Sequence, residues 1–254
     1  MKLLLDMGNT RLKWALQPTS SAGWLAHGSM DWQGGMLTGL AAAWASLPRP
    51  TAVVAASVVD SEREAQLAAV SRGLWRREPH WLRTPASACG VRNAYAEPER
   101  LGVDRFLAMV AAHADGHGAC VLASAGTALT LDAMTADGRH LGGLIAPGVQ
   151  LMQQSLLQAT ARVRPERPGR LLELADNTAD AVSSGCWQAV IALVERFAGR
   201  MEKQLAAVPT LILAGGDAQQ LAALLPLPAQ LSRDSVLRGL ALWAQTHMPA
   251  PSTD

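Results

Sequence analysis

The first part of the chain alternates between short apolar runs and longer amphipathic stretches. Residues 2–7 (KLLLDM) form an apolar run, and residues 11–17 (RLKWALQ) alternate polar and apolar side chains after a Gly-Asn pair. This pattern predicts a strand, a tight turn and a second strand. The same periodicities predict the remaining elements of this part, which are strands at 23–29, 51–57 and 80–84 and helices at 35–46, 61–73 and 98–113. Ser61 and Glu64 have the spacing of a capping box at the start of the second helix.

The pattern begins again after the turn at Asp115-Gly116. Residues 119–124 (ACVLAS) form an apolar run, a turn follows at 125–127, and residues 129–134 (LTLDAM) form a second strand. The elements predicted after these are a strand at 140–146, helices from about 147 and about 178, a strand at 210–216 and a helix at 234–246.

The two parts of the chain can be superimposed at an offset of 118 residues. Leu4 then coincides with Leu122, Gly8 with Gly126 and Thr10 with Ala128. This repeat predicts a duplicated α/β fold, with one lobe at 1–114, a second at 115–254 and a cleft between their glycine turns.

Composition and charge exclude several classes of protein. The 22 Lys and Arg residues nearly balance the 21 Asp and Glu residues, so no excess of basic charge points to a nucleic-acid or membrane partner. The arginine-rich segment 162–170 contains no aromatic residue for base stacking and is expected to be a surface loop. Three cysteines without a CxxC pair exclude a disulfide framework and indicate a reducing compartment. With no signal peptide or membrane span in the pattern, we expect a soluble, cytoplasmic protein.

Tryptophan dominates the few aromatic residues of the chain. Eight Trp stand beside one Tyr and two Phe. Trp14 and Trp24 fall on predicted strands of the first lobe, and packing is the simplest role for them.

The first glycine turn could bind phosphate. Asp6 ends an apolar strand, and Gly8, Asn9 and Thr10 follow it with Lys13 three residues further on. Successive backbone N–H groups in such a turn can bind phosphate oxygens, and the carboxylate can hold Mg²⁺ directly or through water. The alternative is an ordinary Asx-type hairpin turn with a solvated lysine.

The second glycine turn, residues 124–128, is the repeat partner of the first. Two facing glycine turns could clamp one triphosphate, whereas the second turn taken alone is no more than a hairpin. Thr130 and Asp132 follow on its strand, and Ser124 stands where the first lobe has Asp6.

A third candidate site begins the helix predicted near residue 102. Asp104 and Arg105 point about 100° apart on a helix, so they would contact different ends of a bound molecule. Asp104 could act as general base toward a hydroxyl and Arg105 could bind a carboxylate. The alternative is an exposed helix start with an acidic residue in its first turn.

Five segments in one order extend over most of the chain. They are DMGNTRLK (6–13), VRNAYAEPERLGVDR (91–105), SAGTALTLD (124–132), GGLIAPG (142–148) and NTADAVSSG (177–185). In these segments the chain resembles the type III pantothenate kinases, a family that includes proteins called Bvg accessory factors. The resemblance implies two ribonuclease-H-like lobes, as in the superfamily of acetate and sugar kinases, Hsp70 and actin-like ATPases.

The resemblance also implies an activity and a set of site residues. The activity is ATP-dependent phosphorylation of pantothenate to 4′-phosphopantothenate, the first step of coenzyme A biosynthesis, by a homodimer. The ATP-binding residues would be Asp6, Met7, Gly8, Asn9, Thr10, Arg11, Leu12, Lys13, Gly126 and Thr127, with Mg²⁺ at Asp6. Asp104 would be the catalytic base, and the pantothenate pocket would contain Tyr95, Gly102, Val103, Asp104, Arg105 and Thr178. Thr178 taken alone resembles a helix N-cap, and Gly215 and Gly216 lie where the superfamily binds adenosine.

Ser124 departs from the family pattern. The family usually has an Asp there that binds an activating monovalent cation, and a serine hydroxyl carries no negative charge. We therefore expect weak or absent dependence on K⁺ or NH₄⁺. Two other functions stay open, a weakly active or non-catalytic accessory protein and another small-molecule kinase of the superfamily. Tyr95 with Asp104 and Arg105 favours pantothenate over other acceptors, and retention of Asp6 and Lys13 favours catalysis.

Overall fold

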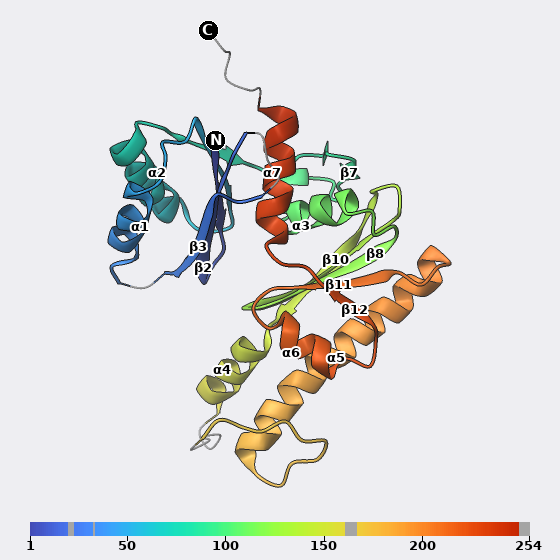
Figure 1. Cartoon of the computed structure of the whole chain (residues 1–254). Coiled ribbons are helices and arrows are strands. Elements are labelled where there is room, and N and C mark those ends of the chain that lie inside the picture. The colour runs from blue at the N-terminus through green and yellow to red at the C-terminus, as the bar shows by residue number, and fades with distance from the viewer. Residues whose placement is uncertain (20–22, 33, 161–166, 249–254) are drawn as a thin grey trace. The chain divides into compact units, whose positions relative to one another are not determined.

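The computed structural model describes residues 1–19, 23–32, 34–160 and 167–248. Its contacts divide the chain into two compact units (Figure 1). The first unit contains residues 1–116 and the segment that starts at Asp234, and the second contains residues 117–233. Each unit has its own five-stranded sheet.

The sheet of the first unit has the strand order β3-β2-β1-β4-β5. Its strands are β1 (Lys2–Met7), β2 (Arg11–Gln17), β3 (Ala26–Asp31), β4 (Ala52–Ser57) and β5 (Pro79–Leu82). The central strand β1 pairs antiparallel with β2 and parallel with β4. The β1–β2 turn therefore opens at the edge where β1 and β4 both end.

Helices cover both faces of this sheet (Figure 1). The helices of the unit are α1 (Met36–Ala45), α2 (Ser61–Trp75), α3 (Val103–Ala114) and α7 (Ser235–His247), with a short 3-10 turn at Pro98–Arg100 and a small hairpin of β6 (Ser87–Ala88) and β7 (Val91–Arg92). Leu3 and Leu5 pack into one core with α1 and α2, where Trp14, Trp44 and Trp75 also lie. Helices α3 and α7 pack on each other and on the central strands. Leu3, Leu4, Leu5 and Met7 of β1 are all apolar and buried because both faces of the strand are covered.

The second unit repeats the topology of the first. Its sheet has the order β10-β9-β8-β11-β12. The strands are β8 (Cys120–Ala125), β9 (Ala128–Met134), β10 (His140–Pro147), β11 (Thr210–Ala214) and β12 (Ala229–Leu231), and the helices are α4 (Val149–Ala159), α5 (Thr178–Leu205) and α6 (Ala218–Leu224). Strand β8 pairs antiparallel with β9 and parallel with β11, as β1 does with β2 and β4. The predicted duplication is confirmed.

The second glycine turn is one residue shorter than the first. The Gly8 N–H donates to the carbonyl of Arg11, whereas the Gly126 N–H donates to the carbonyl of Ala128, both at 3.1 Å. Ala128 therefore corresponds to Arg11 and not to Thr10, so the offset of 118 residues falls to 117 after the turn.

The structure differs from the sequence prediction in the placement of the last helix. We expected α7 in the second lobe, but it packs on α3 and β1 of the first unit. An amphipathic helix shows that it has a buried face without showing which sheet covers it.

Smaller differences concern helix caps and short elements. Asp60, not Ser61, caps α2, because its carboxylate accepts the Arg63 N–H at 2.9 Å. Strand β3 begins at Ala26, so Trp24 lies outside it. Helix α6 and strand β12 were not predicted. Residues 162–166 of the arginine-rich segment lie outside the described residues.

None of the helices in the described part of the chain is long and apolar enough to cross a membrane.

Candidate functional site

The first glycine turn places an acidic and a basic residue side by side. In the β1–β2 register Asp6 pairs with Lys13, and the Gly8 turn closes the hairpin. Asn9 is exposed at the tip of this turn, while Met7 and Leu12 are fully buried beneath it. The turn thus presents backbone to solvent on a rigid, buried base.

Asp6 lies in an unusual electrostatic environment. Burial, followed by the negative charges of Asp104 and Asp234, raises its pKa from 3.8 to about 7, and only the Lys13 ammonium opposes this shift. The Lys13 ammonium lies 3.5 Å from the Asp234 carboxylate. Three carboxylates and one lysine, from four different elements or their ends, therefore form one acidic cluster in the first unit.

Asp234 was missed by the sequence analysis. It stands directly before α7 in the left-handed backbone region, with φ of 50°, and its side chain does not cap the helix. The only signal in the sequence was an acidic residue before a predicted helix. Its proximity to Lys13 comes from the return of α7 to the first unit.

The start of α3 contributes Asp104 to this cluster. Asp104 is in the first turn of α3, and its carboxylate accepts the Arg105 N–H at 2.8 Å. A Cβ at Gly102 would lie 2.6 Å from the Asp104 carboxylate oxygen, so a side chain there would displace it. Val103 is buried in the core beneath.

Arg105 and Tyr95 lie together, as the prediction of a shared pocket requires. The Arg105 guanidinium donates to the Tyr95 hydroxyl at 3.2 Å and lies 6.0 Å from the centre of the tyrosine ring. Arg105 is only 6% exposed. A guanidinium held in this way is suited to a carboxylate ligand, because burial strengthens such an ion pair.

The second glycine turn is closely packed by backbone. The Gly148 N–H donates to the Thr127 carbonyl at 2.9 Å, and a Cβ at Gly148 would lie 1.8 Å from the Gly126 carbonyl oxygen. These segments line a small hollow with Asp217, whose pKa is raised by burial. Ser124 pairs with Thr130 on one side and Ala214 on the other. Position 148 therefore has no room for a side chain, whereas a Cβ at Gly126 would meet no atom within 4 Å.

Asp132 on β9 faces the interior of the second unit. Its carboxylate lies 3.0 Å from the His140 ring nitrogen, and both side chains are almost fully buried. This pair joins β9 to β10 and is structural.

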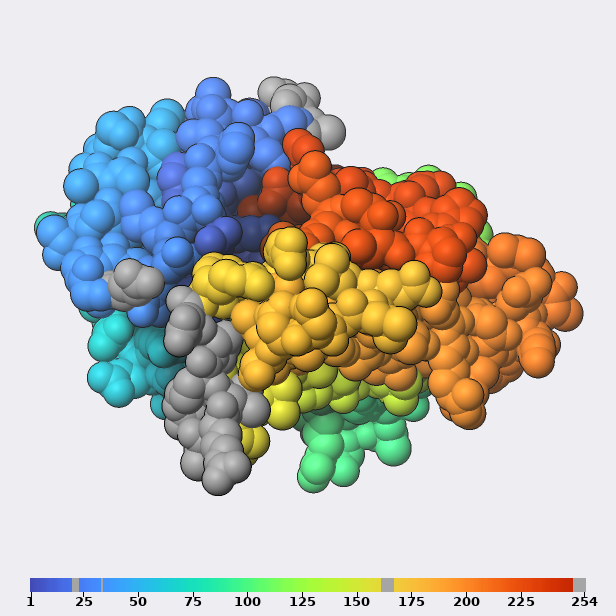
Figure 2. All heavy atoms as spheres, turned by 90° about the horizontal axis from the view of Figure 1, so that it is seen from below, coloured from blue at the N-terminus to red at the C-terminus, as the bar shows by residue number. Residues whose placement is uncertain are grey.

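Thr178 is the first residue of α5 but does not cap it. The N-cap is Asn177, whose side chain accepts the Asp180 N–H and donates to the Asp180 carboxylate. Arg167 and Arg170 also bind this carboxylate, and they lower the pKa of Asp180. The exposed residues of the segment before α5 belong to the golden-yellow part of the surface in Figure 2. The network gives Thr178 a fixed place at the helix start.

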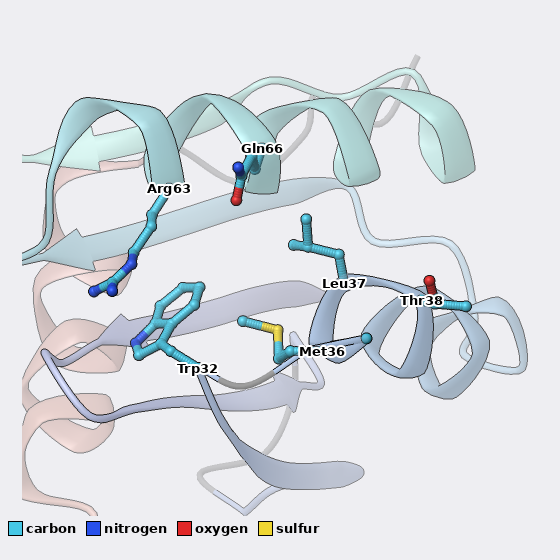
Figure 3. Close-up of a pocket in the computed structure, with 7 residues that line it drawn as sticks. Trp32, Met36, Leu37, Thr38, Arg63 and Gln66 are labelled. Atoms are coloured by element: carbon cyan, nitrogen blue, oxygen red, sulfur yellow. The ribbon is translucent and has the colours of Figure 1, made fainter.

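A pocket lies beside the first glycine turn. It is lined by Trp32, Gly35, Met36, Leu37, Thr38, Arg63 and Gln66 (Figure 3). Trp32 joins it to the turn, because its indole N–H donates to the Gly8 carbonyl at 2.6 Å.

The acidic cluster is compatible with a magnesium ion that is carried mainly by phosphates. The described residues contain no group of three or more His, Cys, Asp or Glu arranged to hold a metal by themselves. Mg²⁺ usually keeps several waters and takes one or two carboxylates together with substrate phosphates. The half-buried Asp6, surrounded by excess negative charge, fits this role.

Comparison with known proteins identifies the family. The family model for type III pantothenate kinase matches residues 2–200. The chain belongs to the type III pantothenate kinase family. A type III pantothenate kinase from Laribacter hongkongensis is 45% identical over 95% of this chain and 97% of its own length. Another from Nitrosospira multiformis is 37% identical over 94% of this chain and 88% of its own length. The resemblance inferred from the five segments is confirmed.

Solved structures agree on the fold. A putative Baf family transcriptional activator from Campylobacter jejuni is 18% identical with a TM-score of 0.61, covering 96% of this chain and 98% of that one. A putative 2-dehydro-3-deoxygalactonokinase from Sinorhizobium meliloti is 15% identical with a TM-score of 0.62, covering 98% and 100%. With the repeated sheet order, these similarities confirm the predicted α/β class of two ribonuclease-H-like lobes. As a type III pantothenate kinase the chain is a phosphotransferase with an alcohol acceptor.

Proposed function

We propose that this kinase phosphorylates the 4′-hydroxyl of pantothenate with ATP, the first step of coenzyme A biosynthesis, using Asp104 as the base. The observation that carries the proposal is the acidic cluster. Asp104 of α3 lies near enough to Asp6 of the first glycine turn to raise its pKa, although the two are 98 positions apart in the sequence. This proximity supports the assignment of Asp104 as a base that acts beside the phosphate-binding turn.

The nucleotide would bind at both glycine turns. In the first unit, residues 6–13 supply backbone N–H groups and the Lys13 ammonium for the phosphates, and Asp6 supports Mg²⁺. In the second unit, Gly126 and Thr127 would contact ATP, since a Cβ at Gly126 would meet no atom within 4 Å and the backbone there is open to a ligand. A magnesium ion held at Asp6 would supply positive charge to the phosphates during the transfer.

The acceptor would bind at the start of α3. Arg105, held by Tyr95, would pair with the pantothenate carboxylate. Gly102 and Val103 shape the backbone next to Asp104, and Thr178 of the second unit would add a hydroxyl contact.

The reaction then needs one proton acceptor and correct alignment. Asp104 takes the proton of the pantothenate hydroxyl as the hydroxyl oxygen attacks the terminal phosphorus of ATP in line. The bond between that phosphorus and the bridging oxygen breaks, and ADP leaves with its electron pair. Most of the rate gain comes from positioning and charge neutralisation.

The experiment is an assay of ADP release with and without pantothenate, on the wild type and on Asp104→Asn. The wild type should release ADP only with pantothenate, and the substitution should lower turnover by about 10²–10⁴-fold because it removes the base and keeps the shape. Glu99→Gln, an equal change at an exposed carboxylate just before α3, serves as the control. Near-normal turnover of Asp104→Asn would refute the role of Asp104.

An accessory protein of low activity is the second candidate, and Ser124 is the observation that favours it. The side chain at this position is a hydroxyl between Thr130 and Ala214 and carries no charge. Binding of ATP and pantothenate with no ADP release, at any K⁺ concentration, would favour this candidate.

We further propose a cytoplasmic homodimer. Large apolar side chains are exposed on the edge strand β10 and on the helix that follows it, namely Leu144, Ile145, Leu151 and Leu156. A second copy of the chain would cover such a surface.

A further inference from the structure

Trp32 forms hydrogen bonds to residues on both sides of the tip of the first glycine turn. Its indole N–H donates to the Gly8 carbonyl at 2.6 Å, and its backbone N–H donates to the Thr10 carbonyl at 3.2 Å. Trp32 comes directly after β3, two strands away from β1 in the sheet. The turn is therefore held from outside its own hairpin.

The indole contact determines which way one peptide group of the turn faces. The described chain contains no cis peptide bond, so the Gly8 carbonyl and the Asn9 N–H point in opposite directions across one planar unit. With the carbonyl tied to Trp32, the Asn9 N–H faces away from the indole. Glycine permits rotation of this peptide more readily than other residues do, so the hydrogen bond is what selects the orientation.

The indole is itself held by a second element. The Arg63 guanidinium of α2 lies over the Trp32 ring at 5.1 Å from its centre (Figure 3). Arg63 also pairs with Asp60 at 3.6 Å, and Asp60 caps the same helix. Helix α2 therefore helps to fix the position of the indole ring, which does not depend on the turn alone.

We propose that Trp32 is a positioning residue for ATP: it holds the Gly8 peptide so that the Asn9 N–H is available to a phosphate oxygen before the nucleotide arrives. This inference rests on the proposed function, since it assigns the turn to ATP phosphates. Without the indole N–H, part of the binding energy of ATP would be spent on orienting the peptide.

The test is Trp32→Phe, which keeps an aromatic ring under Arg63 and removes the indole N–H. Calorimetric titration with ATP, without pantothenate, should show about 3- to 15-fold weaker binding, the worth of one hydrogen bond. The KM for ATP should rise by the same factor, whereas kcat and the KM for pantothenate stay close to wild type.

Trp44→Phe is the matched control. It also removes an indole N–H, but that of Trp44 is buried and has no hydrogen-bond partner. It should lower the melting temperature and leave ATP affinity unchanged. The inference is overturned if Trp32→Phe binds ATP like wild type, or if Trp44→Phe weakens binding equally. A wild-type chain that binds ATP without phosphorylating pantothenate would overturn the proposed function alone.

Discussion

At the scale of single residues, Asp6 illustrates how a side chain acquires its chemistry from distant parts of the chain. Its position at the end of an apolar strand could be predicted from the sequence, and so could its possible contact with Mg²⁺. The shift of its pKa could not, because two of its causes, Asp104 and Asp234, lie far along the chain. Coulombic interactions depend on separation in space, which the order of residues does not state.

The raised pKa of Asp6 predicts a pH dependence of stability in the nucleotide-free protein. Because the folded pKa of about 7 exceeds the ordinary 3.8, the contribution of Asp6 to folding is fully present below pH 3.8 and is lost as the pH rises through 7. The asparagine in Asp6→Asn cannot ionise. The free energy of unfolding of this variant, relative to wild type, should therefore rise between pH 5 and pH 8 by on the order of 1–3 kcal/mol. Urea unfolding at the two pH values, without Mg²⁺, measures this. A difference that does not change with pH would contradict the prediction.

Ser124 predicts the response to monovalent cations. A hydroxyl in place of the carboxylate typical of the family offers no charge to a cation, so K⁺ should change the turnover of the wild type little. Ser124→Asp should introduce K⁺ activation. The measurement is turnover in K⁺-free buffer with K⁺ added stepwise, and Ser124→Ala is the control for loss of the hydroxyl. A large rise for the wild type would show that other groups bind the ion.

At the scale of elements, the strand–turn–strand units of the two sheets follow from local pattern, whereas the partner of α7 does not. The two strand–turn–strand units were visible in the sequence because each is short and its period is regular. Helix α7 shows an apolar face that would suit either sheet. The close approach of α7 to α3 at Gly239 settles the choice, since a Cβ there would lie 2.0 Å from the Leu107 carbonyl oxygen.

This contact predicts a large effect of one methyl group. Gly239→Ala should destabilise the protein by more than about 2 kcal/mol, because the carbonyl belongs to the backbone of α3 and cannot move aside. Gly199→Ala is the matched control in α5, where a Cβ would meet no atom within 4 Å. The control should be neutral or stabilising by up to ~1 kcal/mol, since alanine favours helix. Thermal unfolding of both variants measures these changes in stability. Equal stability of the two variants would contradict the packing of α7 on α3.

At the scale of the whole molecule, the chain forms its first unit from two separate segments. Residues 1–116 fold with the segment after Asp234, and the second unit is inserted between them. The return of the chain is what brings Asp234 to Lys13. A simple division at residue 114 therefore separates groups that belong to one acidic cluster.

The proposed homodimer predicts a measurable assembly. Sedimentation should give twice the mass of one chain, and Ile145→Glu should shift the equilibrium toward monomer because Ile145 is 66% exposed on β10. Val208→Glu is the control, since Val208 is also exposed and lies outside the proposed surface. A monomeric wild type would contradict the dimer, and unchanged assembly of Ile145→Glu would place the interface elsewhere.

The sequence by itself determined the family, the duplicated strand pattern, the two glycine turns and the pairing of Tyr95 with the start of α3. These features depend on local periodicity and on residues that are close in sequence or match a known motif. Only the tertiary structure decided the place of α7, the shorter second turn, the role of Asp234 beside Lys13 and the contact of Trp32 with Gly8. Each of these depends on hydrogen bonds, charges or packing between segments far apart in the chain, whose meeting is set by how the sheets and helices fold together.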